Sequence, residues 1–118
     1  MRAKRVDTNQ KELVGYLRTI GISVIHLHGV GAGCPDIACG FGGLCFLAEI
    51  KTEKGKDTQA QKDLMREWTG GKYYLRNTAD CDQLKRTMLQ WLKWIDEGTK
   101  KVIDTPLVDY PNNERDLG

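Results

Sequence analysis

The apolar residues of this chain follow two kinds of spacing. Three stretches repeat every three or four residues, as on one face of a helix, and four are short apolar runs between turn residues, as in strands. Glycines separate most of these stretches, which is typical of turns and element ends. The pattern predicts a helix, three strands, a helix, a strand and a helix. The expected ranges are 8–20, 22–28, 35–39, 44–52, 58–69, 72–76 and 80–97.

The first and last helices carry signals at their ends. Thr8 or Asn9 is expected to cap the first helix, and Gly21 is expected to end it. The last helix should close at Gly98 and bury one apolar stripe, with Trp94 falling beside that stripe. The members of the stripe are Leu84, Met88, Trp91, Leu92 and Ile95.

This order of elements indicates an α/β fold. Strands linked by hairpins and followed by a helical crossover predict a mixed β-sheet flanked by helices, in the order αβββαβα. The chain has 118 residues, the size of one domain, which can bury a core without disulfides. Residues 1–98 are therefore expected to form a single domain. Residues 99–118 contain two prolines and a polar end, and they are expected to form a C-terminal arm or tail.

The strand over 44–52 carries the clearest candidate chemistry. Alternation along a strand places Glu49 and Lys51 on one face near its end, and the preceding hairpin brings Asp36 beside them. Two carboxylates and a lysine form a site for a hard cation, and the backbone carbonyl of Ile50 adds a third oxygen ligand for Mg²⁺ or Mn²⁺. The metal would activate a water molecule and neutralise a phosphate oxygen. Lys51 would orient the nucleophile or stabilise the charge that develops in the transition state.

The alternative is a solvated ion pair on an exposed strand, which is the usual meaning of an isolated Glu-x-Lys. Two neighbouring features favour a site instead. Pro35 and Asp36 lie upstream at hairpin distance after a glycine-rich loop, and Gln61 shares the inward face of the next helix with Leu64 and Met65.

In their order along the chain, these residues resemble the PD-(D/E)XK nuclease superfamily, and in particular a stand-alone minimal form of its VRR-NUC branch. The similarity covers roughly residues 9–78. Ile50 is a mild departure from the branch's usual Glu-Val-Lys. The matching segments are Gly33-Cys34-Pro35-Asp36, Glu49-Ile50-Lys51-Thr52, Lys54-Gly55-Lys56 and Gln61.

The resemblance implies a restriction-endonuclease-like core and a role for each matching residue. Asp36 and Glu49 would bind the metal, Lys51 would be catalytic, and Gln61 would support the site. The branch often carries a glutamate on its first helix, and Glu12 matches that position. Glu12 would then be a further metal ligand, whereas the alternative is a solvated residue beside the apolar stripe.

The expected function is a metal-dependent DNA endonuclease that hydrolyses phosphodiester bonds. Minimal members of this branch resemble junction-resolving enzymes, which implies branched DNA such as a four-way junction as the substrate. Because resolution needs two paired cuts, a homodimer is expected, with Trp94 and the apolar part of the tail as interface material. The tail could instead fold back over Trp94 and leave a monomer. The rival function is a catalytically silent DNA-binding or assembly module of the same fold.

The charge of the chain is compatible with DNA but does not require it. Lysine and arginine number 18 against 16 acidic residues, a net charge of +2. Lys54, Lys56 and Lys62 flank the candidate site and are expected to contact phosphates. They could equally form a solvated turn, because Glu53 and Asp57 dilute their charge.

Other classes of function find less support in the sequence. The four cysteines lack Cys-x-x-Cys spacing, which argues against a redox or zinc motif. His26, His28 and Cys34 lie close together but match no zinc pattern. The histidines are expected to be structural, and the alternative is that they lie near the substrate. The chain has neither an apolar run of roughly 18 residues nor a signal-peptide core. We therefore expect a cytoplasmic protein with no membrane and no small-molecule cofactor.

Overall fold

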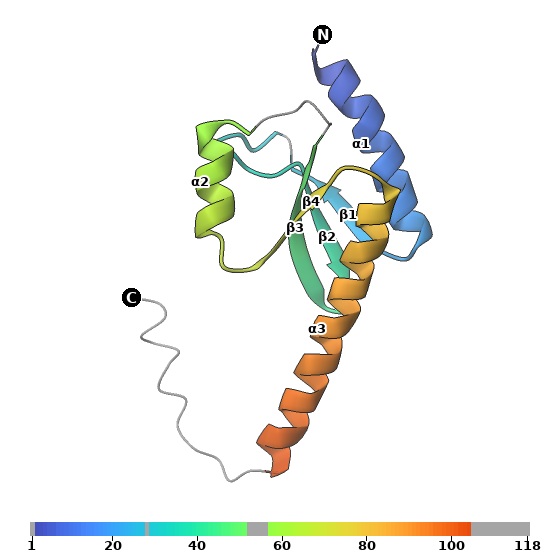
Figure 1. Ribbon diagram of the computed structural model, residues 1–118, viewed down its shortest axis with the longest axis vertical. Coiled ribbons are helices and arrows are strands. Elements are labelled where there is room, and N and C mark those ends of the chain that lie inside the picture. Colours follow the sequence, from blue (N-terminus) through green and yellow to red (C-terminus); the bar gives the residue numbers. More distant parts are fainter. Residues whose placement is uncertain (1, 28, 52–56, 105–118) are drawn as a thin grey trace.

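The computed structural model describes residues 2–27, 29–51 and 57–104, and the side chains of residues 9–27, 29–51 and 57–98. Its elements follow the order αβββαβα, which confirms the predicted order and the mixed α/β class (Figure 1). The elements are α1 (Arg2–Thr19), β1 (Ser23–His26), β2 (Ile37–Phe41), β3 (Leu44–Ile50), α2 (Gln59–Glu67), β4 (Gly71–Leu75) and α3 (Thr78–Asp104).

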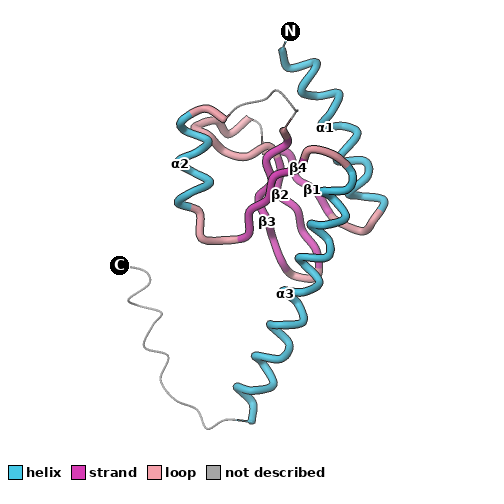
Figure 2. Tube along the Cα trace, viewed as in Figure 1, coloured by secondary structure: helices cyan, strands magenta, loops and turns pink. Residues whose placement is uncertain are grey.

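The four strands form one mixed sheet in the order β1-β2-β3-β4 (Figure 2). The first three strands pair antiparallel, whereas β4 pairs parallel to β3 after the crossover through α2. The β2–β3 hairpin turns at Gly42 and Gly43, which have φ values of 60° and 93°. Positive φ at both central residues is what a two-residue hairpin needs, and glycine adopts it without strain.

The helices cover both faces of the sheet. Helices α1 and α3 lie together on one face, and α2 lies on the other side (Figure 1). Alternate residues of β3, beginning with Phe46, point into the core beneath α1 and α3, so Glu49 points toward α2. The buried core residues are Leu13, Val14, Leu17, Ile22, Ile37, Cys39, Phe46, Ala48, Ile50, Leu75, Cys81, Leu84 and Met88.

Helix α1 begins earlier than predicted. It already includes Arg2, so Thr8 and Asn9 lie inside it and the predicted N-cap is wrong. The preceding residues include alanine, lysine and arginine, which are strong helix formers and extend the helix backward. Its end is confirmed at Gly21, which has a φ of 93°. The Gly21 and Ile22 N–H groups donate to the carbonyls of the last turn at 3.1 and 3.0 Å, as in a Schellman motif.

Helix α3 continues further than predicted. It passes through Gly98 to Asp104, because a single interior glycine costs a helix only about 1 kcal/mol. Leu84 and Met88 are fully buried, as predicted, but Trp91 and Ile95 are 45% and 49% exposed. The helix runs past the end of the sheet (Figure 1), so Trp91 contacts the sheet only at its edge, through Phe46 of β3 at a ring-centre distance of 6.2 Å.

Some predictions fall on residues outside the described parts of the chain. These are the roles of His28, Lys54 and Lys56 and the arm or tail from residue 105 onward. Among the helices of the described ranges, none is both long enough and apolar enough to cross a bilayer.

Candidate active site

Asp36 and the end of β3 meet as the sequence predicted. The hairpin register pairs Ile37 with Ala48, so Asp36 comes beside Glu49. The backbone N–H of Ile50 donates to Oδ2 of Asp36 at 2.8 Å, and the N–H of Leu27 donates to the Asp36 carbonyl at 2.8 Å. These bonds fix both the backbone and the side chain of Asp36 against the sheet.

Glu49 is a buried carboxylate with perturbed chemistry. Its side chain lies on the α2 face of β3, and the residue is only 5% exposed. Burial, and after it the negative charge of Asp36, raises the pKa of Glu49 to about 7, although the nearby Lys51 acts in the opposite direction. The carboxylate is therefore destabilised at neutral pH, and a bound cation would relieve that destabilisation.

Gln61 connects helix α2 to Glu49. Thr58 caps the helix through two reciprocal hydrogen bonds with Gln61. The backbone N–H of Thr58 donates to Oε1 of Gln61 at 2.7 Å, and the Thr58 hydroxyl accepts from the backbone N–H of Gln61 at 3.1 Å. Because Oε1 is held by this capping box, the amide nitrogen of Gln61 must face the other way. It donates to Oε2 of Glu49 at 2.8 Å. The inward orientation predicted for Gln61 is confirmed.

Lys51 directly follows β3, which ends at Ile50 and not at the predicted residue 52. Its ammonium group donates to Oδ1 of Asp57, and the hydroxyl of Tyr74 donates to the other oxygen, Oδ2, at 3.1 Å. The side chains of Lys51 and Asp57 are only 15% and 12% exposed. Sequence reasoning assigned Asp57 only a diluting charge and missed Tyr74. Tyr74 comes beside Glu49 through the parallel register of β3 and β4, and neither strand carries a signal for that register in its own sequence.

The loop before Asp36 packs against the first turn of α2. Gly33 has a φ of 80°, and a Cβ atom built on it would lie 2.5 Å from the carbonyl oxygen of Ala60. Only glycine fits this approach without a shift of the backbone. The loop that carries Asp36 and the helix that carries Gln61 are therefore in direct contact.

The donor set fits a magnesium or manganese ion that keeps most of its water. Within the described ranges, no three His, Cys, Asp or Glu side chains gather as a metal cage. Asp36 and Glu49 provide two carboxylates, and the Ile50 carbonyl would provide a third oxygen; Mg²⁺ commonly binds through so few protein ligands. Glu12 is exposed on α1, and its role as a ligand stays a prediction.

A second buried polar contact lies between α1 and β1, and sequence reasoning missed it. Gln10 is 4% exposed, and its Nε2 lies 2.8 Å from Nδ1 of His26. The expectation that His26 is structural is compatible with this contact, because the imidazole holds a buried amide in place.

Basic side chains line a pocket of about 330 Å³ beside the site, between α2 and β4. Lys62, Arg66 and Lys72 contribute the charge, and Tyr74 forms the wall that this pocket shares with the Lys51 network. Lys72 also donates to the carbonyl of Trp68 at 2.9 Å, which stabilises the end of α2. Arg66 is ion-paired with Asp63 at 3.0 Å, so acidic side chains of α2 partly neutralise this lining, and the phosphate contact of Lys62 stays a prediction.

Comparisons with protein-family models, with curated proteins and with solved structures gave no match to this chain. The assignment of function therefore depends on the geometry of the site and on the ordered motifs that it contains.

Proposed function

We propose that this protein is a Mg²⁺- or Mn²⁺-dependent endodeoxyribonuclease with a restriction-endonuclease-like core. The observation that carries the proposal is the convergence of Asp36 and Glu49 at the end of β3, next to Lys51, which directly follows that strand. Two carboxylates that destabilise each other, with a lysine beside them, form a suitable site for a divalent cation and a phosphodiester.

Each residue has a distinct task in this proposal. Asp36, Glu49 and the Ile50 carbonyl hold the cation, which when bound lowers the pKa of a water molecule and neutralises a phosphate oxygen. Lys51 places a positive charge where negative charge develops on the phosphate. Gln61 donates to Glu49 and keeps that carboxylate oriented toward the cation.

The main rival is a catalytically silent DNA-binding or assembly module. The complete set of Asp36, Glu49 and Lys51 argues against it, because a silent module has no need of a buried, destabilised glutamate. Incubation of the purified protein with plasmid and branched DNA in magnesium, manganese or EDTA separates the two. DNA that is bound but never cut would favour the silent module.

We expect cleavage to require magnesium or manganese, and calcium to support DNA binding without turnover. The reason is the oxygen-only donor set of Asp36 and Glu49. The pKa of Glu49 is raised to about 7, so this carboxyl group carries a proton below that pH. The cation must displace the proton in order to bind there. Manganese affinity, measured by calorimetry, should therefore rise between pH 5 and about pH 7 and level off above it.

Two outcomes would contradict this expectation. Full cleavage in excess EDTA would remove the metal from the mechanism. A manganese affinity that does not change across the same pH range would mean that Glu49 is not a ligand.

The basic pocket supports a path for the DNA backbone along α2. Lys62, Arg66 and Lys72 line it, and its Tyr74 wall borders the site. Cationic side chains of this kind hold phosphates without reading sequence. The path that we propose therefore leads from Lys51 past Tyr74 to Lys62.

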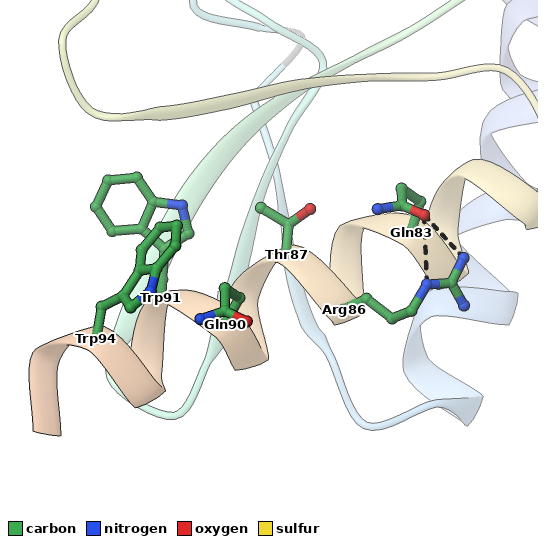
Figure 3. Close-up of a pocket in the computed structure, with 6 residues that line it drawn as sticks. All are labelled: Gln83, Arg86, Thr87, Gln90, Trp91 and Trp94. Carbon is green, nitrogen blue, oxygen red and sulfur yellow. Dashed lines mark hydrogen bonds between the residues drawn. The ribbon is translucent and has the colours of Figure 1, made fainter. Parts of the chain in front are cut away.

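We also propose that the protein acts as a homodimer on branched DNA such as a four-way junction. A two-fold dimer carries two equivalent sites, which matches the two cuts of junction resolution. The interface that we propose is the exposed face of α3 between Gln83 and Glu97. This face carries a pocket of about 360 Å³, and Trp91 and Trp94 stand side by side at one end of it (Figure 3). Arg86 lies at the other end, bonded to Gln83 (Figure 3).

Charge along α3 favours a second copy as the occupant of this face. Arg86 and Glu97 are eleven residues apart, about three helical turns, so they share one face of the helix. An antiparallel second copy would bring each Arg86 opposite Glu97 of the other copy, with the tryptophans covered between them.

Single charge reversals on α3 should therefore weaken the dimer, and the double reversal should restore it. Arg86→Glu and Glu97→Arg each place like charges together, and we expect dimer affinity to fall about tenfold in either variant. Light scattering across the micromolar range measures the effect, and Lys11→Glu, a charge reversal at an exposed position of α1, is the matched control. A wild-type monomer at micromolar concentration, cutting linear duplex as readily as junctions, would overturn both the dimer and the junction preference.

A further inference from the structure

The ammonium group of Lys51 is part of a chain of side chains that joins three segments of the protein. Lys51 lies at the end of β3, Asp57 precedes α2, and Tyr74 lies on β4. The lysine donates to one oxygen of Asp57, and the tyrosine hydroxyl donates to the other at 3.1 Å. Each carboxylate oxygen therefore has its own donor.

The charges within this chain are consistent with that arrangement. The hydrogen bond from Lys51, more than any other interaction, lowers the pKa of Asp57, so the carboxylate stays ionised. Burial, followed by the hydrogen bond to Asp57, raises the pKa of Tyr74, so the hydroxyl keeps its proton and remains a donor. Lys51 also lies over the Tyr74 ring, with its ammonium nitrogen 6.0 Å from the ring centre.

A lysine side chain has four flexible bonds, and a free one would sample many positions. Catalysis by a charged group depends on placing that charge to within a fraction of an ångström. One carboxylate contact occupies one of the three ammonium protons and leaves the others for a substrate. Tyr74 anchors the Asp57 carboxylate to β4, and Tyr74 itself is paired with Glu49 in the parallel register of β3 and β4. The same sheet therefore positions both Lys51 and Glu49.

We propose that Asp57 and Tyr74 are positioning residues that hold the Lys51 ammonium group where it can stabilise the negative charge that develops on the phosphodiester when water attacks it. This inference rests on the proposed nuclease function. It assigns neither residue a contact with the DNA or the metal; both act through Lys51.

The test compares kcat and KM for DNA cleavage in Asp57→Ala, Asp57→Asn and Tyr74→Phe. We expect kcat to fall about 10–100-fold in the Asp57 variants and about 3–10-fold in Tyr74→Phe, with KM nearly unchanged. Asp57→Glu should recover part of the lost kcat. The matched controls are Tyr16→Phe and Asp82→Asn, because Tyr16 donates to Asp82 at 2.7 Å between α1 and α3, away from the site.

A second arm separates positioning from simple loss of structure. In a Lys51→Ala background, which should keep a measurable residual rate in manganese, Asp57→Ala should cause no further fall in kcat. An equal fall in both backgrounds, a change confined to KM, or a faster Asp57→Ala enzyme would overturn the positioning role. A wild-type protein that cuts no DNA would overturn the nuclease function itself, so the two failures are distinguishable.

Discussion

Replacing Lys51 with alanine should lower kcat for DNA cleavage by about 10²–10³-fold while leaving DNA affinity nearly unchanged. The lysine directly follows β3 and its charge acts on Glu49, so we expect it to act on the phosphate that reacts at this site. Steady-state cleavage and equilibrium DNA binding in calcium measure the two quantities separately.

The same substitution has a cost in stability that its control must account for. Without Lys51, the carboxylate of Asp57 loses its cation at a position that is only 12% exposed. We therefore expect a lower melting temperature, which circular dichroism will measure. Lys11→Ala, at an exposed position of α1, should change neither kcat nor melting temperature. If Lys51→Ala keeps wild-type kcat, Lys51 is not the catalytic lysine.

Replacing Glu49 with glutamine should abolish cleavage and, without metal, stabilise the protein at pH 8 by about 2–3 kcal/mol. The folded pKa of about 7 exceeds the ordinary value of 4.5. The unfolded chain therefore loses this proton first, and stability falls as pH rises from about 4.5 to about 7. Glutamine cannot ionise, so the variant escapes this fall and keeps an acceptor for Gln61.

Thermal melting at pH 5 and pH 8, with and without manganese, checks this result. At pH 8 without metal, Glu49→Gln should melt about 10 °C higher than wild type, and the difference should shrink at pH 5. Manganese should raise the melting temperature of the wild type but not that of the variant. A variant that is less stable than wild type at pH 8 would mean that Glu49 carries no electrostatic penalty.

The local part of the structure was accessible from the sequence. Apolar periodicity predicted the order of the seven elements found in the described ranges, because a buried face imposes its spacing on helices and strands alike. Strand alternation also placed Glu49 beside Lys51, and the short hairpin left Asp36 little choice of position. These inferences needed only neighbours along the chain.

What the sequence did not reveal depends on distant elements. Tyr74 reaches Asp57 only because β4 pairs with β3 in one particular register, which the two strands do not encode separately. The exposure of Trp91 and Ile95 depends on where the sheet stops, and no pattern within α3 records that boundary. Gln10 lies four residues before Val14 in a polar stretch, and its burial follows from the packing of α1 on β1.

The close approach of Gly33 to Ala60 has an energetic consequence for the proposed catalyst. Gly33 has a φ of 80°, and a Cβ atom at this position would lie 2.5 Å from the Ala60 carbonyl oxygen. No side chain is therefore tolerated where the loop and the helix meet. The loop bearing Asp36 and the helix bearing Gln61 are therefore assembled during folding rather than when ligands arrive. Folding already pays the conformational entropy of bringing this loop and this helix together. The cation then binds to a preorganised pair of carboxylates, and none of its binding energy is needed to order the loop.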